Sequence, residues 1–257
     1  MSDAARIVRE GDFPRRDLSR LGLPANADGP GDPRAASALV FDAMRRGAAE
    51  ELAAILLGEF RSGRPVEALA DAIVAPAMRR IGREWAEGRM LVWQEHRATQ
   101  TCVAALHELR AAIVPADDDG KRPMALGGGP EGDPYAMANL LAELALASHG
   151  WKAVNLGPNT PLASLRAAVA QLRPRLVWIS ASHLADTSGF LDEYRALYRE
   201  AEKLGTAVAI GGPALTPEMR AQMPCSTHGE SITHLIHFAR ALKPPTGRPR
   251  RGRPRSS

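Results

Sequence analysis

Apolar residues recur every three or four positions between residue 34 and about residue 114, which is the spacing of the buried face of an α-helix. The pattern predicts four helices with short connections, and Gly47 separates the first two. The third helix has the longest stripe, formed by Val66, Leu69, Ile73, Ala77, Ile81 and Trp85. Pro76 lies within this helix and predicts a kink. We therefore expect an antiparallel four-helix bundle over residues 34–115.

The pattern changes after a polar segment at residues 116–121. Short apolar runs then alternate with amphipathic segments, giving five strand–helix units within residues 122–242. The predicted strands are residues 123–128, 152–156, 176–181, 207–210 and 225–227. This order predicts an α/β domain with a doubly wound, five-stranded parallel sheet, flavodoxin-like or Rossmann-like. Its ligand crevice is expected where the strand order reverses, near residues 127–135 and 180–185.

The two ends of the chain lack these patterns. Residues 1–33 include a run rich in Gly, Pro and Asp and predict a linker. Residues 243–257 have too many prolines and too few apolar side chains to pack, so we expect a disordered basic tail. Six basic residues and no acidic ones lie in this tail, and removing their +6 from the total of +4 leaves a net charge of −2 for the rest.

Composition narrows the class of protein. A chain of 257 residues with 45% apolar residues can bury two hydrophobic cores. Two cysteines, Cys102 and Cys225, without CxxC or CxxH spacing argue against a disulfide framework and a structural zinc site. No apolar run reaches the 18 residues or so of a membrane span, and no signal-peptide pattern is seen. These features predict a cytoplasmic protein with no membrane partner.

A glycine-rich segment follows the first predicted strand and reads as GxGxxG from Gly127 to Gly132. Such a loop can cradle a pyrophosphate with backbone N–H groups. Pro130 removes one of those donors, and the second strand is not followed by an acidic residue for a ribose hydroxyl. A simple glycine turn is therefore favoured over a dinucleotide site.

Three chemically distinctive residues meet where the third and fourth predicted helices join. Trp85 ends the third helix, and Glu95 and His96 lie in the first turns of the fourth. Taken alone, these residues are compatible with a core tryptophan that closes the bundle and a partly exposed Glu–His pair.

Within its context this group resembles the cobalamin-binding module, a helical bundle followed by a Rossmann-like domain. The spacing from Trp85 to Glu95–His96 is similar to the W-x9-EH signature of light-sensing, adenosylcobalamin-dependent repressors of the MerR type. In that family these residues line the pocket of the upper axial ligand. The resemblance covers residues 34–242 and implies that the bundle covers the upper face of the corrin ring, while the α/β domain binds the lower face and the nucleotide tail.

Two further segments resemble the lower half of that site. Ser180 and Ser182 are similar to the serine pair that flanks the buried dimethylbenzimidazole base. Gly211 and Gly212 are similar to the paired glycines after the fourth strand, where the absence of Cβ atoms lets the nucleotide tail lie against the backbone.

The loop that supplies the lower cobalt ligand departs from the family. Where the family has DxHxxG, this chain keeps Asp133 but has Tyr135 at the histidine position and Ala138 at the glycine position. A phenol is a poor donor to cobalt, and its reference pKa is near 10. Three alternatives stay open: cobalamin binds without a lower protein ligand, Tyr135 coordinates as phenolate, or no cofactor binds. His183 could substitute as a ligand, although an exposed loop histidine is the simpler interpretation.

Both termini suggest contact with DNA. The tail has a Gly-Arg-Pro core flanked by arginines and resembles an AT-hook, a peptide that lays arginines in the minor groove. Its arginines are Arg248, Arg250, Arg251, Arg253 and Arg255. A solubilising basic tail is the alternative. Residues 4–24 resemble the last helix and exit segment of a MerR-type DNA-binding domain, so either that domain was lost or the true start lies upstream of Met1.

The sequence therefore predicts a cobalamin-binding sensor linked to transcription control, with adenosylcobalamin as the favoured cofactor and a homo-oligomer or protein partner as its output. One alternative is a corrinoid shuttle subunit of a methyltransferase system. Another is a degenerate interaction module without cofactor.

Overall fold

The computed structural model describes residues 29–114 and 120–242. The basic tail with its five arginines and most of the N-terminal segment lie outside these residues, so the predictions made for them stay predictions. In the described part of the chain, no helix is both long and apolar enough to cross a membrane.

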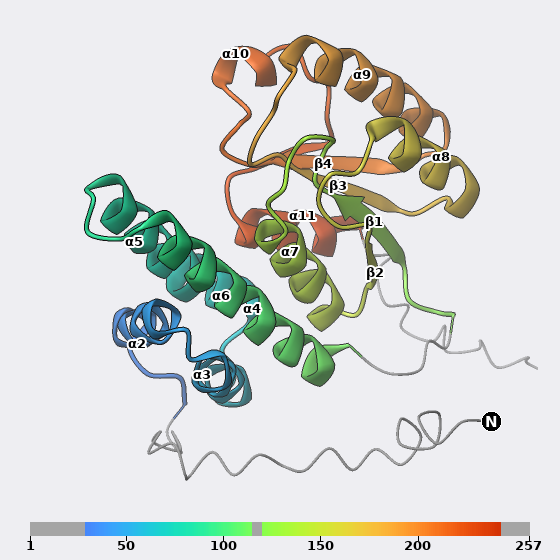
Figure 1. The fold of residues 1–257 in the computed structure, drawn as a ribbon. Coiled ribbons are helices and arrows are strands. Elements are labelled where there is room, and N and C mark those ends of the chain that lie inside the picture. The colour runs from blue at the N-terminus through green and yellow to red at the C-terminus, as the bar shows by residue number, and fades with distance from the viewer. Residues whose placement is uncertain (1–28, 115–119, 243–257) are drawn as a thin grey trace, which may run out of the picture.

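The first half of the described chain is helical, as predicted (Figure 1). Its helices are α2 (Pro33–Arg46), α3 (Ala49–Arg61), α4 (Val66–Ala68), the π-helix η2 (Leu69–Val74), α5 (Ala75–Ala86) and α6 (Val92–Ile113). Asp32 caps α2 by accepting a hydrogen bond from the backbone N–H of Arg34 at 2.9 Å, and Gly47 ends it in the left-handed conformation. The helices bury a common core that includes Val40, Leu52 and Leu106.

The third predicted helix is continuous but not uniform. It consists of α4, η2 and α5, and the π-helical turn directly precedes Pro76. A proline has no backbone N–H and crowds the preceding turn, and a π-helical turn is one way to accommodate it. The predicted stripe is buried up to Ile81, but Trp85 is 50% exposed and does not belong to the core.

The second half is the predicted doubly wound sheet, with five parallel strands in the order β2-β1-β3-β4-β5. The strands are β1 (Met124–Gly128), β2 (Lys152–Asn155), β3 (Leu176–Ser180), β4 (Ala207–Gly211) and β5 (Thr227–Gly229). The helices are α7 (Met137–Ser148), α8 (Leu162–Leu172), α9 (Thr187–Lys203), α10 (Pro217–Arg220) and α11 (Ile232–Leu242). The predicted position of β5, residues 225–227, was wrong by two residues.

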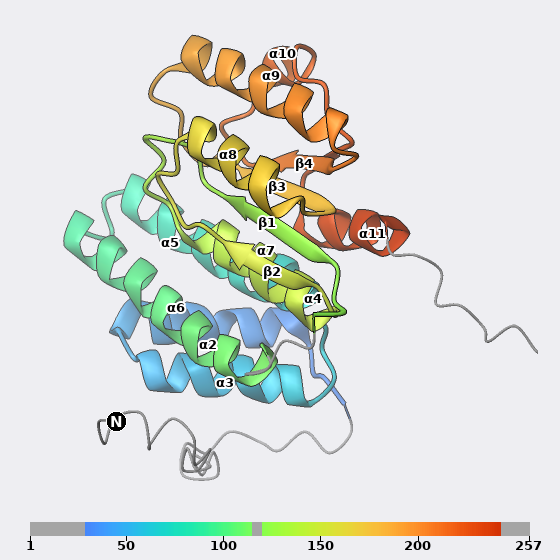
Figure 2. The same ribbon diagram turned by 90° about the vertical axis from the view of Figure 1, so that its right-hand side faces the viewer.

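The molecule is layered (Figures 1 and 2). Helices α8 and α9 cover one face of the sheet, and α7 and α11 cover the other. The bundle packs on α7 and α11, so that bundle, α7, α11 and one sheet face share a single apolar cluster. Figure 2 shows that the connection between α5 and α6 lies on the same side of the molecule as the carboxyl ends of the strands.

Candidate functional site

A cavity of about 290 Å³ lies at the carboxyl ends of β3, β4 and β5, between α7, α11 and the bundle. Its wall is mostly apolar side chains and glycine backbone; the polar side chains on it are those of Asp71, Ser180, Thr227, Glu230 and Ser231. The volume is at the lower end of the range for small-molecule sites. The cavity therefore suits a small, largely uncharged group rather than a phosphate.

The cavity lies at the edge of the sheet where the crevice was predicted, at the carboxyl ends of the strands. Ser180 lines it, but the loop at residues 129–135 does not. In that loop the N–H of Gly129 donates to the carbonyl of Gly157 at 3.0 Å, and the N–H of Gly132 donates to Oδ1 of Asn159 at 2.8 Å. Since these donors are used within the protein, the loop behaves as a glycine turn and not as a pyrophosphate cradle.

Gly211 and Gly212 both line the cavity, and the fold itself also requires glycine at these two positions. A Cβ atom on Gly211 would meet the carbonyl oxygen of Gly229, and one on Gly212 would meet that of Ala181. Gly212 also has a φ of 111°, which side chains rarely adopt. The close approach of neighbouring strand ends therefore requires these glycines before any ligand is considered.

Asp133 ties two of the loops at the strand ends together. It is fully buried, and its carboxylate accepts hydrogen bonds from the backbone N–H groups of Tyr135 at 3.0 Å, Ser182 at 2.6 Å and His183 at 3.2 Å. A buried carboxylate is tolerated when several donors satisfy it. Asp133 therefore has a structural task that does not need a histidine at position 135.

Tyr135 lies beside this carboxylate with 53% of its surface exposed, and His183 is also exposed. The described residues include no group of three or more His, Cys, Asp or Glu side chains arranged to hold a metal ion. Ser180 lines the cavity, whereas Ser182 does not and instead donates its backbone N–H to Asp133.

The α5–α6 corner, residues 85–96, is held by its own backbone. Gly88 adopts a left-handed conformation and donates its N–H to the carbonyl of Trp85, while the N–H groups of Arg89 and Met90 donate to Glu84. The Arg89 guanidinium also bonds the exposed Glu84 carboxylate at 3.1 Å, which lowers the pKa of that carboxyl. Met90 is buried and anchors the turn.

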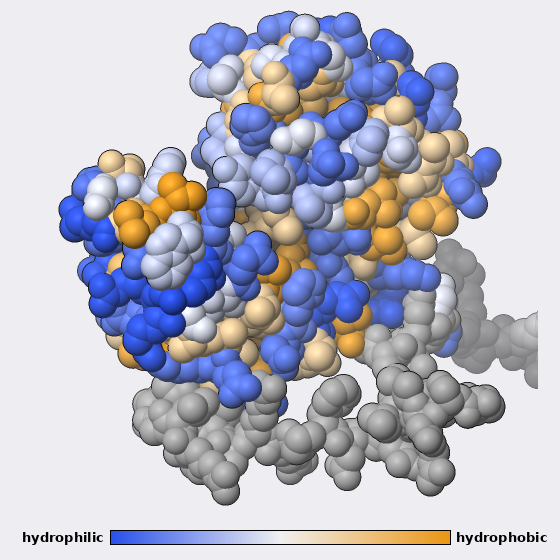
Figure 3. Space-filling model, in the orientation of Figure 1, coloured by the Kyte–Doolittle hydropathy of each residue, from blue (hydrophilic) through white to orange (hydrophobic). Residues whose placement is uncertain are grey.

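Part of the outer surface of this corner is apolar. Besides Trp85, it exposes Leu91, Val92 and Trp93, each by more than half. Figure 3 shows a small hydrophobic patch at this end of the bundle, surrounded by hydrophilic residues. The alternative of a core tryptophan at position 85 is therefore wrong. Adjacent exposed apolar side chains of this size are typical of surfaces that contact a ligand or a partner.

The Glu–His pair lies beside this surface. The hydroxyl of Thr99 donates to the Glu95 carboxylate at 2.9 Å, and His96 Nε2 is 3.6 Å from the other carboxylate oxygen. Trp93 was not among the predicted site residues; its ring lies 5.1 Å from the Arg97 guanidinium one helical turn later. The sequence contains the spacing that indicates this contact, because Trp93 and Arg97 are four residues apart and therefore lie on the same helix face.

The predicted site residues thus form three groups in the structure. Trp85, Glu95 and His96 share the corner, Ser180, Gly211 and Gly212 line the cavity, and Asp133, Tyr135 and Ser182 are joined by the hydrogen bonds of the Asp133 carboxylate. The α5–α6 corner lies on the same side of the molecule as the carboxyl ends of the strands (Figure 2). Among the described residues, no hydrogen bond or ion pair joins the corner directly to the cavity or to the loop at residues 129–135.

Residues 38–110 match the family model of the B12 binding domain. Two transcriptional repressors of Myxococcus xanthus are similar in sequence. The HTH-type repressor CarA is 33% identical over 45% of this chain and 37% of its own length, and CarH is 31% identical over 62% and 52%. The chain therefore spans at most about half the length of these relatives. The predicted resemblance to a cobalamin-binding module is confirmed by these matches.

The fold agrees with a solved corrinoid protein. The monomethylamine corrinoid protein of Methanosarcina barkeri superposes with a TM-score of 0.65, covering 79% of this chain and 96% of that one at 15% identity. At this identity the likeness shows a shared fold.

Replacing Asp133 tests whether its hydrogen bonds hold the two loops at the strand ends together. We expect Asp133→Ala to lower the free energy of unfolding by about 3 kcal/mol, because three backbone donors lose a charged acceptor in a buried place. Asp186→Ala is the matched control: Asp186 also accepts backbone N–H groups, but it caps α9 at an exposed position and should cost about 1 kcal/mol. Urea unfolding measures the free energy of unfolding of both variants. An equal decrease in the two would contradict the role of Asp133 in holding the loops together.

Proposed function

We propose that the protein binds cobalamin, with adenosylcobalamin as the favoured form, and acts as a regulatory sensor linked to transcription control rather than as a catalyst. The observation that carries this proposal is the α5–α6 corner. It keeps Trp85, Val92 and Trp93 exposed on the side of the strand carboxyl ends, although burial of such side chains would normally be favourable. The flat face of a corrin ring between the corner and the strand ends would cover them.

The residues present fit most of such a ligand. The mostly apolar cavity beside Gly211 suits the heterocyclic base of the nucleotide tail, and Ser180 on its wall supplies a hydroxyl. The corner suits the upper face of the corrin ring. The position of the lower ligand differs, because Tyr135 offers a phenol where the resemblance implies an imidazole. We therefore propose that cobalamin is held by its tail and upper face without a protein ligand to cobalt from below.

When bound, adenosylcobalamin would supply a light-sensitive group on its upper face. Trp85, Val92 and Trp93 would exclude water there, and the bond from Thr99 would hold Glu95 in place. Asp133 would keep the loop of Tyr135 in register with the loop after β3. A change in how the bundle seats would then alter binding to a second copy, a protein partner or DNA.

The proposal includes contact with DNA because the two similar proteins are named as HTH-type transcriptional repressors. It would involve the arginines of the tail or a domain preceding the segment, both beyond the described residues. A corrinoid shuttle for methyl transfer is the alternative, because the fold is shared with a corrinoid protein of that kind. The apolar corner favours the sensor, since a shuttle has to present the upper face of its cobalt to other proteins.

Binding is tested by mixing the protein in the dark with adenosyl-, methyl- or hydroxocobalamin and measuring cobalt retained after gel filtration. We expect retention of adenosylcobalamin and an increase of about tenfold or more in Kd for Trp85→Ala and for His96→Ala. Leu172→Ala is the control, since Leu172 is similarly exposed but ends α8 on the other face of the sheet. Equal retention by all variants would remove the corner from the site, and no retention of any cobalamin would overturn the proposed function.

Substitution of Tyr135 tests the lower face separately. If no protein atom ligates cobalt from below, Tyr135→Phe keeps both the retained cobalt and the visible absorption spectrum of the complex. Tyr135→His introduces an imidazole, a good cobalt ligand, and should change the spectrum. A spectral change in the Phe variant would instead identify Tyr135 as a ligand.

A further inference from the structure

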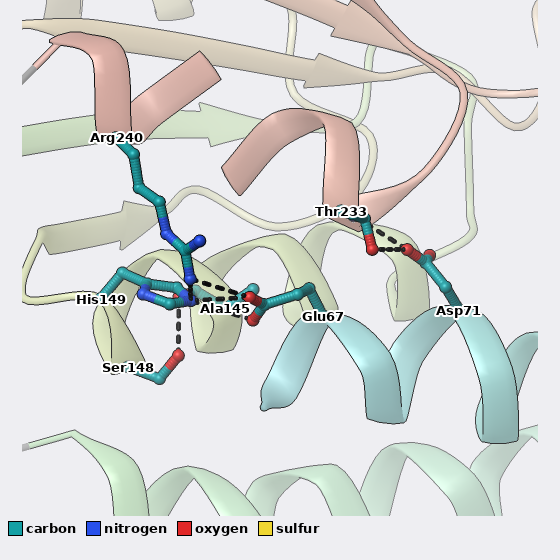
Figure 4. Close-up of polar contacts among 7 residues, drawn as sticks. All are labelled: Glu67, Asp71, Ala145, Ser148, His149, Thr233 and Arg240. Carbon is teal, nitrogen blue, oxygen red and sulfur yellow. Dashed lines mark hydrogen bonds and ion pairs between the residues drawn. The ribbon is translucent and has the colours of Figure 1, made fainter. Parts of the chain in front are cut away.

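A carboxylate from the bundle completes the first turn of a helix in the α/β part of the chain (Figure 4). Asp71, in η2, accepts hydrogen bonds from the backbone N–H groups of Ile232 at 3.0 Å and Thr233 at 2.8 Å. The Thr233 hydroxyl donates to it as well, at 2.6 Å. The first turn of α11 contains no acidic residue of its own, so Asp71 both satisfies free N–H groups and complements the helix dipole.

The same carboxylate-bearing residue is part of the cavity wall. Asp71 lines the cavity together with Ala70 and Ala75, and on the other side of the contact Ser231 and Ile232 line it too. The wall is therefore made by two segments about 160 residues apart in the chain, joined at this point by the Asp71 hydrogen bonds. Asp71 also lies in the π-helical turn, a rare backbone geometry that is frequent at functional positions.

We propose that Asp71 is a positioning residue that links occupancy of the cavity to the seating of the helical bundle. The inference rests on the proposed function, in which an uncharged aromatic heterocycle fills the cavity. A group that contacts both walls stabilises the bundle against α11, and by thermodynamic reciprocity a well-seated bundle raises affinity for that group. Asp71 thereby couples binding of the nucleotide tail in the cavity to the position of the helices that bear the α5–α6 corner.

A second contact between the same parts of the chain serves as a control. Glu67, in α4, bonds the ring of His149 at 2.9 Å and the guanidinium of Arg240 at 3.3 Å (Figure 4). Glu67 is nearly buried and also joins the bundle to α7 and α11, but it does not line the cavity. Loss of Glu67 weakens the interface without touching the cavity wall.

The experiment compares the full chain with Asp71→Ala, Asp71→Asn and Glu67→Ala. Each is titrated in the dark with adenosylcobalamin and with adenosylcobinamide, a corrinoid without the nucleotide tail. We expect Asp71→Ala to raise the Kd for adenosylcobalamin about tenfold and that for adenosylcobinamide much less, because cobinamide has no nucleotide tail to contact the cavity wall. Asp71→Asn should recover part of the loss, because its amide oxygen still accepts a backbone N–H. Glu67→Ala also weakens the seating of the bundle, but it should change the ratio of the two Kd values less than Asp71→Ala does, because Glu67 does not line the cavity.

Hydrogen exchange gives a second measurement on the same proteins. Adenosylcobalamin should slow exchange at the amides of Ile232 and Thr233 in the wild-type chain, but not in Asp71→Ala. Wild-type binding with equal Kd ratios in the Asp71 and Glu67 variants would overturn this inference alone. Failure of the wild-type chain to bind either corrinoid would overturn it together with the proposed function.

Discussion

Helix α7 is buried on both sides, and the arrangement of the whole molecule depends on this. Nine consecutive residues, from Asn139 to Ala147, are buried because the helix packs against the sheet on one side and against the bundle on the other. A helix that is apolar nearly all round has to be covered all round. Its one charged residue, Glu143, is paired with Arg110 of α6 at 2.6 Å, a bond that also joins the bundle to α7. This packing brings the α5–α6 corner to the side of the strand carboxyl ends.

Local sequence patterns predicted the elements and the doubly wound parallel sheet, but not what the elements bury. The three- and four-residue spacing from Val66 predicted one helix correctly, yet the same spacing put Trp85 on the buried face, where the structure exposes it. Periodicity describes a face of a helix and does not tell where the neighbouring helix ends. The cavity could not be predicted either, because Asp71 and Ile232 are brought together only by the packing of the bundle on α11. The sequence also did not indicate that the close approach of Ala181 requires glycine at position 212.

Asp133 explains how the loops at the strand ends stay ordered with a tyrosine at position 135. Its three backbone hydrogen bonds are independent of the side chain at that position. In the proposed site, the upper corner and the lower cavity would be two separate contact surfaces for one ligand, connected through the bundle and not through a bond between the protein and cobalt. In this account, binding depends on the nucleotide tail and on the apolar corner together.

The most direct test of this two-sided site is a hydrogen-exchange footprint of the full chain with adenosylcobalamin in the dark. The account predicts slower exchange both at the α5–α6 corner, residues 85–96, and at the cavity wall, residues 211–212 and 229–232. Protection on one side only, or on neither, would contradict it.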